Sequence, residues 1–575
     1  MTTPGHDPRW DDEVDLLVIG GGAAGMTAAL VGSIEGLRTM LCEKTEMVGG
    51  TTATSAGTVW IPGSSQSSRA GIPDSVEEAK RYLRAVVGAE AQDRRLAAFL
   101  ASGPSALDYL EARTDVTFIP ASAHPDYQKQ PGAAFGGRAL GTAPFDGRRL
   151  GADFDRVRPP RPEFLVLGGM MVGRADIPFL LAPFASTKAF LHAAGMVARQ
   201  AMDRLRHKRG TRLIMGNALV ARLLYSLRRR NVGIRFETQM TDLVMEGGRV
   251  IGAKLATPHG QRTIRAGRGV ILATGGIAWN ADLRSRLFPE PARQFSLAPP
   301  ANTGDGIIAA IQSGAGLEQD MQSPALWMPC SVLRRPDRTS SVFPHIVLDR
   351  AKPGLIAVNS TGRRFVNEAN SYHDFVVAML RSNEAAPSIP AHLICDRRFI
   401  RDYGIGLVHP GRRDLGWFVK AGYLIESDTI AALAQRIGAD PESLQRTIAS
   451  HNRFAEAGVD EEFGRGSSDL NRVNGDPGNK PNPCLRKIGP GPYYAVAVWP
   501  ADLASSAGLR TDENGSVLDR QGKSIEGLYA VGNDAASVFR GTYPGPGTML
   551  GPAIVFGWRA AMHAANRTSL GENAP

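Results

Sequence analysis

Three glycines and one carboxylate near the start of the sequence have the types and spacing of a phosphate and ribose site. Gly20, Gly22 and Gly25 form a G-x-G-x-x-G pattern, and Glu43 follows Gly20 by 23 residues. The first glycine allows a tight turn, the second lets a pyrophosphate approach the backbone, and the third lets a helix pack on a strand. A carboxylate at this distance accepts hydrogen bonds from ribose hydroxyls. The pattern predicts that a dinucleotide binds here.

The glycines have this meaning only if a strand and a helix flank them. Val14–Ile19 is a short β-rich run, Met26–Leu37 is a stretch of small, helix-favouring residues, and Thr39–Cys42 is a second apolar strand. Strand, glycine loop, helix and strand make a βαβ unit, whose helix N-terminus offers unpaired N–H groups to phosphates. We therefore expect a Rossmann-like α/β domain. The alternative is a glycine-rich turn in an unrelated α/β protein.

Three more segments indicate FAD rather than a nicotinamide cofactor. A loop of glycines and small hydroxyl residues covers Gly49–Gly57, an apolar strand ends in Ile271–Gly276, and a third segment is Gly527–Asn533. Segments this far apart suit an extended FAD molecule. A nicotinamide domain would be confined to the N-terminal residues.

The composition is that of a globular protein with a local excess of positive charge. Of 575 residues, 43% are apolar and 21% are charged, which excludes a disordered or fibrous protein. The net charge is +10, and the window Arg199–Arg230 holds ten Lys or Arg residues against one acid, Asp203. Such a window suits nucleic acid or an anionic membrane surface. Nucleic-acid binding gives no reason for the FAD segments, so we expect no nucleic-acid partner.

The cysteines and the N-terminus indicate the compartment. Cys42, Cys330, Cys395 and Cys484 lie far apart without a C-x-x-C pattern or a histidine cluster, so we expect no metal site and no disulfide. The first residues are polar and acidic, unlike a signal peptide. No uncharged apolar run approaches the ~20 residues that span a bilayer. We expect a cytoplasmic protein, with contact at the inner face of the membrane as an open alternative.

Phe164–Leu191 is apolar but is interrupted by glycine and proline. One interpretation is an irregular segment that lines the substrate cleft or a subunit contact. The other is a loop that dips into the membrane interface beside the basic residues that follow, within an apolar and basic stretch over 164–230. The sequence leaves both open, together with the question of a homo-oligomer.

Further motifs carry a resemblance to a known family. They are Gly216–Val220, Asn359–Glu368 (NSTGRRFVNE) and Thr542–Gly547 (TYPGPG). With the N-terminal fingerprint, they make the chain resemble the FAD-dependent fumarate reductase/succinate dehydrogenase flavoprotein superfamily. Within it, the chain is most similar to the 3-ketosteroid Δ1-dehydrogenases. The resemblance covers nearly the whole chain.

The resemblance implies a discontinuous FAD-binding domain and an inserted α+β catalytic domain. The FAD-binding domain would span 1–300 and 486–575, and the catalytic domain 301–485. The motifs and the resemblance together predict these FAD contacts: Gly20, Gly22, Ala24, Gly25, Glu43, Gly50, Thr51, Thr52, Ser55, Ala56, Gly57, Ala273, Thr274, Gly275, Gly532, Asn533, Gly547 and Leu550.

Departures from the fumarate reductases disfavour a dicarboxylate substrate. Met549 stands where the resemblance places their proton-delivering arginine, and Asp502–Gly508 lacks their histidine. Two carboxylates would then be poorly compensated, although Arg540 lies nearby in sequence. Relatives with covalent flavin present a histidine near Thr51 and Thr52, so we expect noncovalent FAD.

Three tyrosines match the steroid dehydrogenases. The resemblance implies that the Tyr543 hydroxyl and the Gly547 backbone N–H bind the substrate's C3 oxygen as an oxyanion site. It implies that Tyr372 removes the C2 proton while Tyr127 supports it, and that a hydride passes from C1 to flavin N5. An unperturbed tyrosine has a pKa of about 10, so we expect nearby donors to lower that of Tyr372.

The expected substrate is thus a 3-ketosteroid undergoing 1,2-dehydrogenation, with a quinone-type or artificial electron acceptor. The alternatives within this chemistry are Δ4-(5α)-dehydrogenation of a ketosteroid and dehydrogenation of another cyclic ketone. A fumarate-type reductase is the remote alternative.

Overall fold

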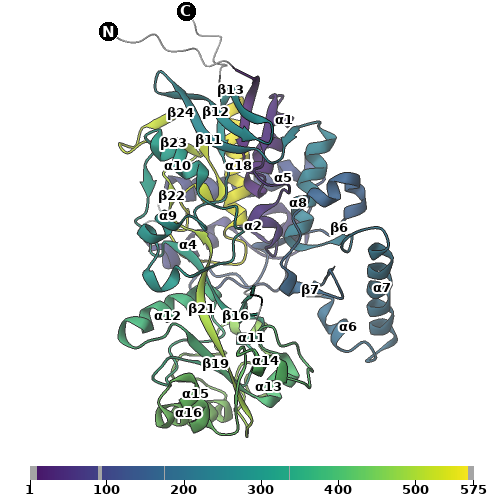
Figure 1. Ribbon diagram of the computed structural model, residues 1–575, viewed down its shortest axis with the longest axis vertical. Helices are drawn as coiled ribbons and strands as arrows, with labels where there is room; N and C mark the ends of the chain where they lie inside the picture. Colours follow the sequence, from purple (N-terminus) through teal and green to yellow (C-terminus); the bar gives the residue numbers. More distant parts are fainter. Residues whose placement is uncertain (1–9, 89–92, 174, 336, 338, 568–575) are drawn as a thin grey trace, which may run out of the picture.

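Two β-sheets, one above the other in Figure 1, organise the structure. The computed structural model describes residues 10–88, 93–173, 175–335, 337 and 339–567. Within these residues the first sheet has eight strands in the order β10-β2-β1-β13-β12-β11, with β24 beside β13 and β23 beside β24. Its strands are β1 (Asp12–Ile19), β2 (Thr39–Cys42), β10 (Gly233–Arg235), β11 (Gln239–Glu246), β12 (Arg249–Thr257), β13 (Gly260–Leu272), β23 (Ser516–Leu518) and β24 (Ser524–Ala530).

The parallel strands bring distant cofactor segments together. β1 pairs in parallel with β2 and β13, and β13 pairs in parallel with β24. Because Ile19 pairs with Leu272 and Leu272 pairs with Ala530, the three strands end at one edge of the sheet. The loops that follow contain the glycine fingerprint, Ala273–Gly275 and Gly532–Asn533. Open parallel sheets bind ligands at this edge.

Helices cover this sheet because its central strands are apolar on both faces. The helices α1 (Ala23–Ile34), α8 (Met215–Arg229) and α18 (Leu550–Ala565) share one core with β1. Small residues let α1 and α18 approach closely, since a Cβ on Gly557 would lie 2.6 Å from the Ala24 carbonyl oxygen. This packing holds both helix N-termini near the edge where the strands end.

The second sheet is mainly antiparallel and forms the lower part of Figure 1. Among the described residues its order is β17-β16-β21-β19-β18, and β14 and β20 also pair with β21. Its strands are β14 (Phe295–Ser296), β16 (Ala325–Arg334), β17 (Ser340–Pro344), β18 (Leu355–Val358), β19 (Ala391–Asp396), β20 (Ile425–Ser427) and β21 (Tyr493–Ser505). The helices packed with it are α12 (Tyr372–Ala385), α13 (Arg397–Tyr403), α15 (Ile430–Ile437) and α16 (Pro441–Ala457). The expected fold, a Rossmann-like domain with an inserted α+β unit, is confirmed.

The structure differs from the expected division at two strands. β14 falls within 1–300, which the resemblance assigned to the FAD-binding domain, yet it pairs with β21 in the second sheet. β21 falls within 486–575, which the sequence assigned to the FAD-binding domain, yet it lies between β16 and β19 in the second sheet. Its largely buried residues find their strand partners there, and no motif marks this change of sheet in the sequence.

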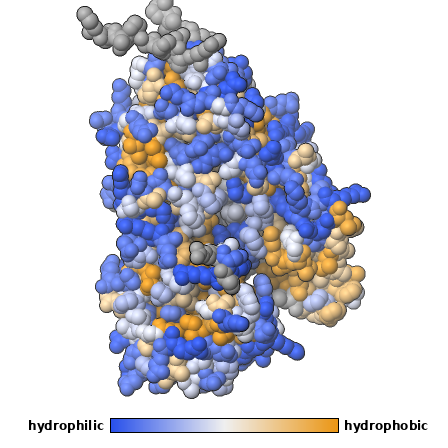
Figure 2. Space-filling view, in the orientation of Figure 1, coloured by the Kyte–Doolittle hydropathy of each residue, from blue (hydrophilic) through white to orange (hydrophobic). Residues whose placement is uncertain are grey.

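A hairpin and two helices project from the side of the first unit (Figure 1). We call residues 165–205 the apolar arm; it contains β7 (Leu165–Val166), β8 (Met170–Met171), α6 (Ile177–Leu181) and α7 (Thr187–Arg204). Its exposed large apolar side chains are Leu167, Ile177, Phe184, Phe190, Leu191, Val197, Met202 and Leu205. Figure 2 shows this region as an apolar area on the surface. No helix in the described part of the chain has the length and apolarity needed to cross a membrane.

Candidate active site

A cavity of about 930 Å³ starts at the edge where the parallel strands end and extends to the second sheet. Apart from Gly25, its wall contains every predicted FAD contact: Gly20, Gly22, Ala24, Glu43, Gly50, Thr51, Thr52, Ser55, Ala56, Gly57, Ala273, Thr274, Gly275, Gly532, Asn533, Gly547 and Leu550. Tyr127, Tyr372 and Tyr543 line the same cavity. Residues from distant parts of the chain thus meet around one space.

The three fingerprint glycines occupy different surroundings. Gly20 has φ +113°, and a Cβ there would lie 2.1 Å from the Ala273 carbonyl oxygen. A Cβ on Gly25 would lie 1.9 Å from the Gly20 carbonyl oxygen, so this glycine lets α1 pack on the loop. Gly22 faces open space, where the nearest atom to a Cβ would be Thr52 Oγ1 at 4.0 Å. Two glycines therefore shape the loop, and the third leaves room for a ligand.

Glu43 joins the end of β2 to the glycine loop. Its Oε2 accepts a hydrogen bond from the Gly21 backbone N–H at 2.9 Å, and its Oε1 accepts two from Thr45, each at 2.9 Å. A carboxylate has about four lone-pair sites, so one remains for a ribose hydroxyl.

Asp534, which no motif marks, holds one cofactor segment in place. Its carboxylate accepts hydrogen bonds from the backbone N–H groups of Thr274, at 2.5 Å, and Gly276, at 2.9 Å. Asp534 is fully buried, and this burial raises its pKa although the N–H donors oppose the change. The only signal in the sequence was an acid directly after Gly532-Asn533.

The cavity has the features that an FAD molecule needs. The N-termini of α1 and α18 both reach its wall, and neither helix has a side-chain cap hydrogen bond from its N-cap residue. Backbone N–H groups at such ends attract phosphate. Asn302 links two segments of the wall, because its Nδ2 donates to Thr51 Oγ1 at 3.2 Å and to the Gly275 carbonyl at 2.9 Å.

At the other end of the cavity, three tyrosines form one cluster. The Tyr127 hydroxyl donates to the Tyr372 hydroxyl at 3.2 Å, and the Tyr372 hydroxyl donates to the Tyr543 hydroxyl at 2.9 Å. The Tyr372 ring meets the other two edge to face, with centroid distances of 5.6 and 5.2 Å. All three residues are buried. The structure therefore brings together the three side chains that the resemblance selected.

Local contacts fix each tyrosine. Tyr372 is the first residue of α12, whose N-cap Ser371 accepts a hydrogen bond from the Asp374 N–H at 3.1 Å. The Tyr127 backbone N–H donates to the Pro544 carbonyl at 2.8 Å, which ties it to the segment that carries Tyr543. Gly547, in the same segment, has φ +98°, and a Cβ there would lie 2.6 Å from the Thr58 carbonyl oxygen. A side chain at Gly547 is thus disfavoured on two grounds.

Burial, not hydrogen bonding, dominates the electrostatics of Tyr372. Burial raises the pKa of Tyr372 well above its ordinary range, and the Tyr543 hydrogen bond and the charge of Arg350 only partly oppose this. The expectation that neighbouring donors lower this pKa does not describe the ligand-free cluster. Tyr127 and Tyr543 also have raised pKa values because they are buried.

Arg350 is a buried cation behind Tyr372. Its side chain has no exposed surface and donates to the carbonyls of His345 at 3.0 Å, Glu368 at 2.6 Å and Asn370 at 3.4 Å. Burial lowers its pKa to about 10, so it stays charged at neutral pH. Arg350 thus holds the loop that leads into Tyr372 and places a positive charge near it. No sequence motif marks Arg350 for this role.

The side chains that replace the fumarate reductase set have other partners. Met549 lines the cavity beside Tyr543, whose hydroxyl lies 3.8 Å from its sulfur. Asp502 pairs with buried Arg284, and Arg540 lies 3.7 Å from Glu318 and is not part of the cavity wall. Arg540 therefore does not replace the missing cations.

The apolar arm contributes side chains both to the cavity wall and to the outer surface of the protein. Leu165, Val166, Met171, Val172 and Ile177 line the cavity, whereas the arm's helices expose apolar side chains on the outside. Lining of the cleft, the first interpretation of Phe164–Leu191, thus describes the hairpin end.

Known proteins resemble the chain over almost its whole length. A family model described as an FAD binding domain matches residues 15–550. The chain is 38% identical to the 4-oxocyclohex-2-ene-1-carboxylate 5-dehydrogenase of Sinomonas cyclohexanicum, covering 97% of this chain and 95% of that protein. It is 36% identical to the 3-oxosteroid 1-dehydrogenase of Mycobacterium tuberculosis, covering 96% and 99%. A crystal structure of the 3-ketosteroid Δ1-dehydrogenase from Sterolibacterium denitrificans, in complex with 1,4-androstadiene-3,17-dione, matches with a TM-score of 0.89 at 35% identity, covering 96% and 99%.

Proposed function

The chain belongs to the family of flavoproteins with this FAD-binding domain, so FAD is its cofactor, and from that premise we propose that it catalyses the 1,2-dehydrogenation of a 3-ketosteroid. One observation carries the proposal. The Tyr372 and Tyr543 hydroxyls lie 2.9 Å apart in the wall of the cavity that also contains Gly547 and the FAD segments. An acid–base group and an oxyanion donor are thus adjacent where the ring of a ketone would meet the cofactor.

Each residue of the cluster has a role in the proposed reaction. Tyr543 and the Gly547 N–H bind the C3 oxygen and stabilise the negative charge that develops on it. Tyr372, in its charged form, takes the proton from C2, and the hydrogen on C1 leaves with its electron pair as the C1–C2 double bond forms. FAD, when bound, supplies the acceptor of that hydride. Tyr127 donates to Tyr372 and Arg350 positions its loop, and the positive charge of Arg350 favours the charged form of this base.

The wall around the tyrosines suits a flat apolar substrate. Its apolar side chains are Leu297, Met328, Ile346, Leu470, Leu503 and Met549. A second candidate function is dehydrogenation of a carboxylated ring ketone, which the 38% identity to the Sinomonas enzyme favours. A carboxylate needs a cation, but Lys44, Arg161 and Arg212 in the wall already lie near carboxylates, at 2.9, 3.5 and 3.0 Å. Arg158, the fourth Lys or Arg of the wall, donates through Nη2 to Thr45 Oγ1 at 3.1 Å, and that hydroxyl donates to Glu43, one of the predicted FAD contacts. The steroid is therefore the better match.

Two substrates separate these functions. We expect the purified yellow protein to reduce a dye acceptor with androst-4-ene-3,17-dione and to give a product two hydrogens lighter. Rapid turnover of 4-oxocyclohex-2-ene-1-carboxylate without turnover of the steroid would select the second function. With 5α-androstane-3,17-dione, which has neither a 1,2- nor a 4,5-double bond, the position of the new double bond, read by NMR, separates 1,2- from 4,5-dehydrogenation.

For the location of the protein, we propose that the apolar arm rests on an anionic membrane surface. Phe184 and Leu205 are 86% and 85% exposed, the exposed cations Lys188 and Arg204 lie on the same arm, and exposed Lys208 follows shortly after it. Apolar insertion and attraction to anionic headgroups would act together there. The hairpin end of the arm lines the cavity, so a steroid or a quinone-type acceptor could pass between the lipid and the site.

Vesicle binding tests this location. We expect the protein to pellet with anionic vesicles, to be released as salt rises, and to lose binding in the variant Phe184→Ser/Leu205→Ser. The matched control, Ile119→Ser/Val459→Ser, removes two apolar side chains that are 52% and 58% exposed elsewhere and should still bind. Equal binding by both variants would contradict the proposal, as would an arm that is buried in a stable dimer.

A further inference from the structure

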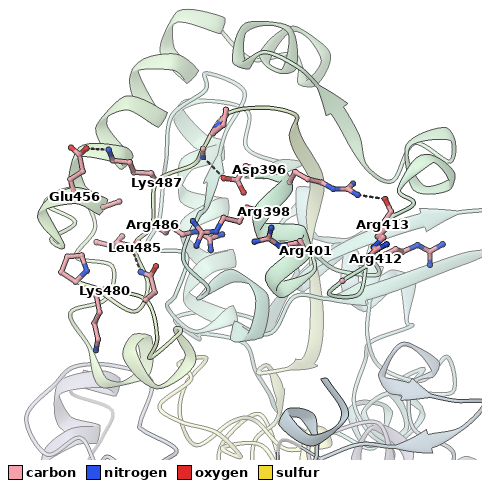
Figure 3. A pocket seen from close by; sticks show the side chains of 17 residues that line it. Asp396, Arg398, Arg401, Arg412, Arg413, Glu456, Lys480, Leu485, Arg486 and Lys487 are labelled. Carbon is pink, nitrogen blue, oxygen red and sulfur yellow. Dashed lines mark hydrogen bonds and ion pairs between the residues drawn. The ribbon is translucent and has the colours of Figure 1, made fainter. Parts of the chain in front are cut away.

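A second cavity, of about 990 Å³, lies in the α+β unit, and Figure 3 shows its wall. α13, the loop 411–413, the end of α16 and the segment 479–490 surround it. It shares no wall residue with the cavity that contains the tyrosines. The proposed dehydrogenation therefore does not account for it.

This second cavity is strongly cationic, and we call it the arginine cleft. Its charged wall residues are Arg397, Arg398, Arg401, Arg412, Arg413, Lys480, Arg486 and Lys487, with only Asp396 and Glu456 as acids. The whole chain has a net charge of +10, so a large part of its excess surrounds one concave surface. In Figure 3 Arg398 and Arg401 of α13 lie close to Arg486, and Arg412 and Arg413 lie further along the same wall.

The nearby acid does not neutralise these cations. Asp402, behind the wall, lies 3.4 Å from Arg398, 2.9 Å from Arg401 and 3.1 Å from Arg486. Burial alone would raise the pKa of Asp402, but the hydrogen bonds and charges of Arg401 and Arg486 outweigh this and lower it. Asp402 is therefore ionised at neutral pH. One carboxylate thus serves three guanidinium groups, and a surplus of positive charge remains.

Arg486 is a nearly buried cation whose guanidinium group lies over the Tyr403 ring, 5.4 Å from its centroid, and is only partly hydrogen-bonded. Its side chain is only 10% exposed, and a buried charge is costly unless it is paired. Nη1 reaches Asp402, whereas Nε and Nη2 are buried without a hydrogen-bond partner among the described residues. Within the same described part of the chain, Arg413 and Lys480 make no ion pair at all.

We propose that the arginine cleft binds a small anion with two or more phosphate groups. Guanidinium groups bind phosphate through paired N–H donors, and several of them converge here. The cavity is much larger than a single phosphate needs. Its wall has eight Lys or Arg residues against two acids, more positive charge than one bound carboxylate would neutralise. Nucleic acid would call for a basic stripe along the surface rather than one concave site.

Calorimetry on the FAD-loaded protein tests this. We expect pyrophosphate and ATP to bind saturably with a 1:1 ratio at about 0.15 M NaCl, and orthophosphate to bind at least about tenfold more weakly. The variant Arg401→Gln/Arg413→Gln should weaken pyrophosphate binding at least about tenfold, since each lost bond to a charged group costs about 1.5–3 kcal/mol.

A matched variant controls for general charge. Arg446 and Arg453 are exposed on α16 but do not line the cleft, so Arg446→Gln/Arg453→Gln removes the same charge from the same unit. This control should bind pyrophosphate as the parent does, and both variants should keep their FAD, melting temperature and turnover. No saturable binding up to about 1 mM, equal loss in both variants, or orthophosphate binding as tightly as pyrophosphate would overturn the proposal. Binding of ATP without pyrophosphate would overturn it too, because a nucleoside rather than the phosphates would then be recognised.

Discussion

Replacing Tyr372 with phenylalanine removes one hydroxyl and leaves the aromatic ring in place. That hydroxyl bridges Tyr127 at 3.2 Å and Tyr543 at 2.9 Å. Two hydrogen bonds are lost, so the free energy of unfolding should fall by about 1–3 kcal/mol. The edge-to-face ring contacts remain, and FAD should stay bound because its segments lie at the other end of the cavity. Turnover should fall by about two to four orders of magnitude, the usual contribution of a general base.

Proton exchange at C2 isolates the step that Tyr372 performs. With FAD reduced in advance, the parent protein should exchange the C2 hydrogens of a 3-ketosteroid with deuterated water, and Tyr372→Phe should not. Because burial raises the pKa of Tyr372, the charged base becomes more abundant as pH rises. Parent exchange should therefore increase through pH 8 and above, whereas the residual rate of the variant should be insensitive to pH.

Tyr543→Phe is the matched control, because it removes a donor from the C3 oxygen but keeps the base. Both steroid binding and rate should fall in this variant, while the rise of the exchange rate with pH persists. Exchange and oxidation by Tyr372→Phe at close to parental rates would refute the assignment of the base, and Tyr127 would be the next candidate.

Three other substitutions test the surroundings of the site. Gly22→Val should fold but bind no FAD, because Gly22 faces only the cavity; an unchanged ratio of flavin to protein absorbance would contradict this. Arg350→Gln should lower turnover at pH 7 about tenfold and shift the pH profile to higher pH, as expected for the loss of a charge interaction of about 1–2 kcal/mol. Arg350→Lys keeps the charge and should restore most of the rate. Equal losses in both variants would leave Arg350 with only a structural role. Burial raises the pKa of Asp374 to about 6, so the folded protein holds this proton more tightly than the unfolded chain, and stability is lost as pH rises through 6. Asp374→Asn should therefore gain about 3 kcal/mol over the parent at pH 8 and about half of that at pH 5, a difference of about 1.5 kcal/mol that denaturant unfolding at the two pH values would show or exclude.

Local spacing accounts for what the sequence could predict of the fold. The glycine fingerprint and Glu43 lie on consecutive elements, so their geometry follows from one βαβ unit. The sheet that contains β21 could not be predicted, because strand pairing is set by partners such as β16 and β19, which are distant in sequence. A run of apolar residues does not reveal which of two sheets will bury it.

The candidate site shows the same difference between local sequence patterns, which could be predicted, and contacts between distant residues, which could not. Tyr372 and Tyr543 were selected because each lies in or near a recognisable motif, and Tyr127 was selected through the family resemblance without a motif of its own. Their contact is made only by the fold. Asp534 and Arg350 were missed because their ligands are backbone groups of other segments, which leave no pattern in the sequence. The raised pKa of Tyr372 was missed for a related reason, since it depends on burial and not on residue type.

The insertion of one unit into the other has a consequence for biosynthesis. A ribosome releases β13, which ends at Leu272, well before its parallel neighbour β24 begins at Ser524. The strands from β14 to β21 emerge between these two, so the α+β unit can fold while the first sheet still lacks a neighbour for β13. Gly547 and α18, which complete the cofactor's surroundings, follow later still. The residues that surround the cofactor are therefore complete only after the whole α+β unit has been synthesised, and a chain whose synthesis stops before α18 would lack part of the cavity wall.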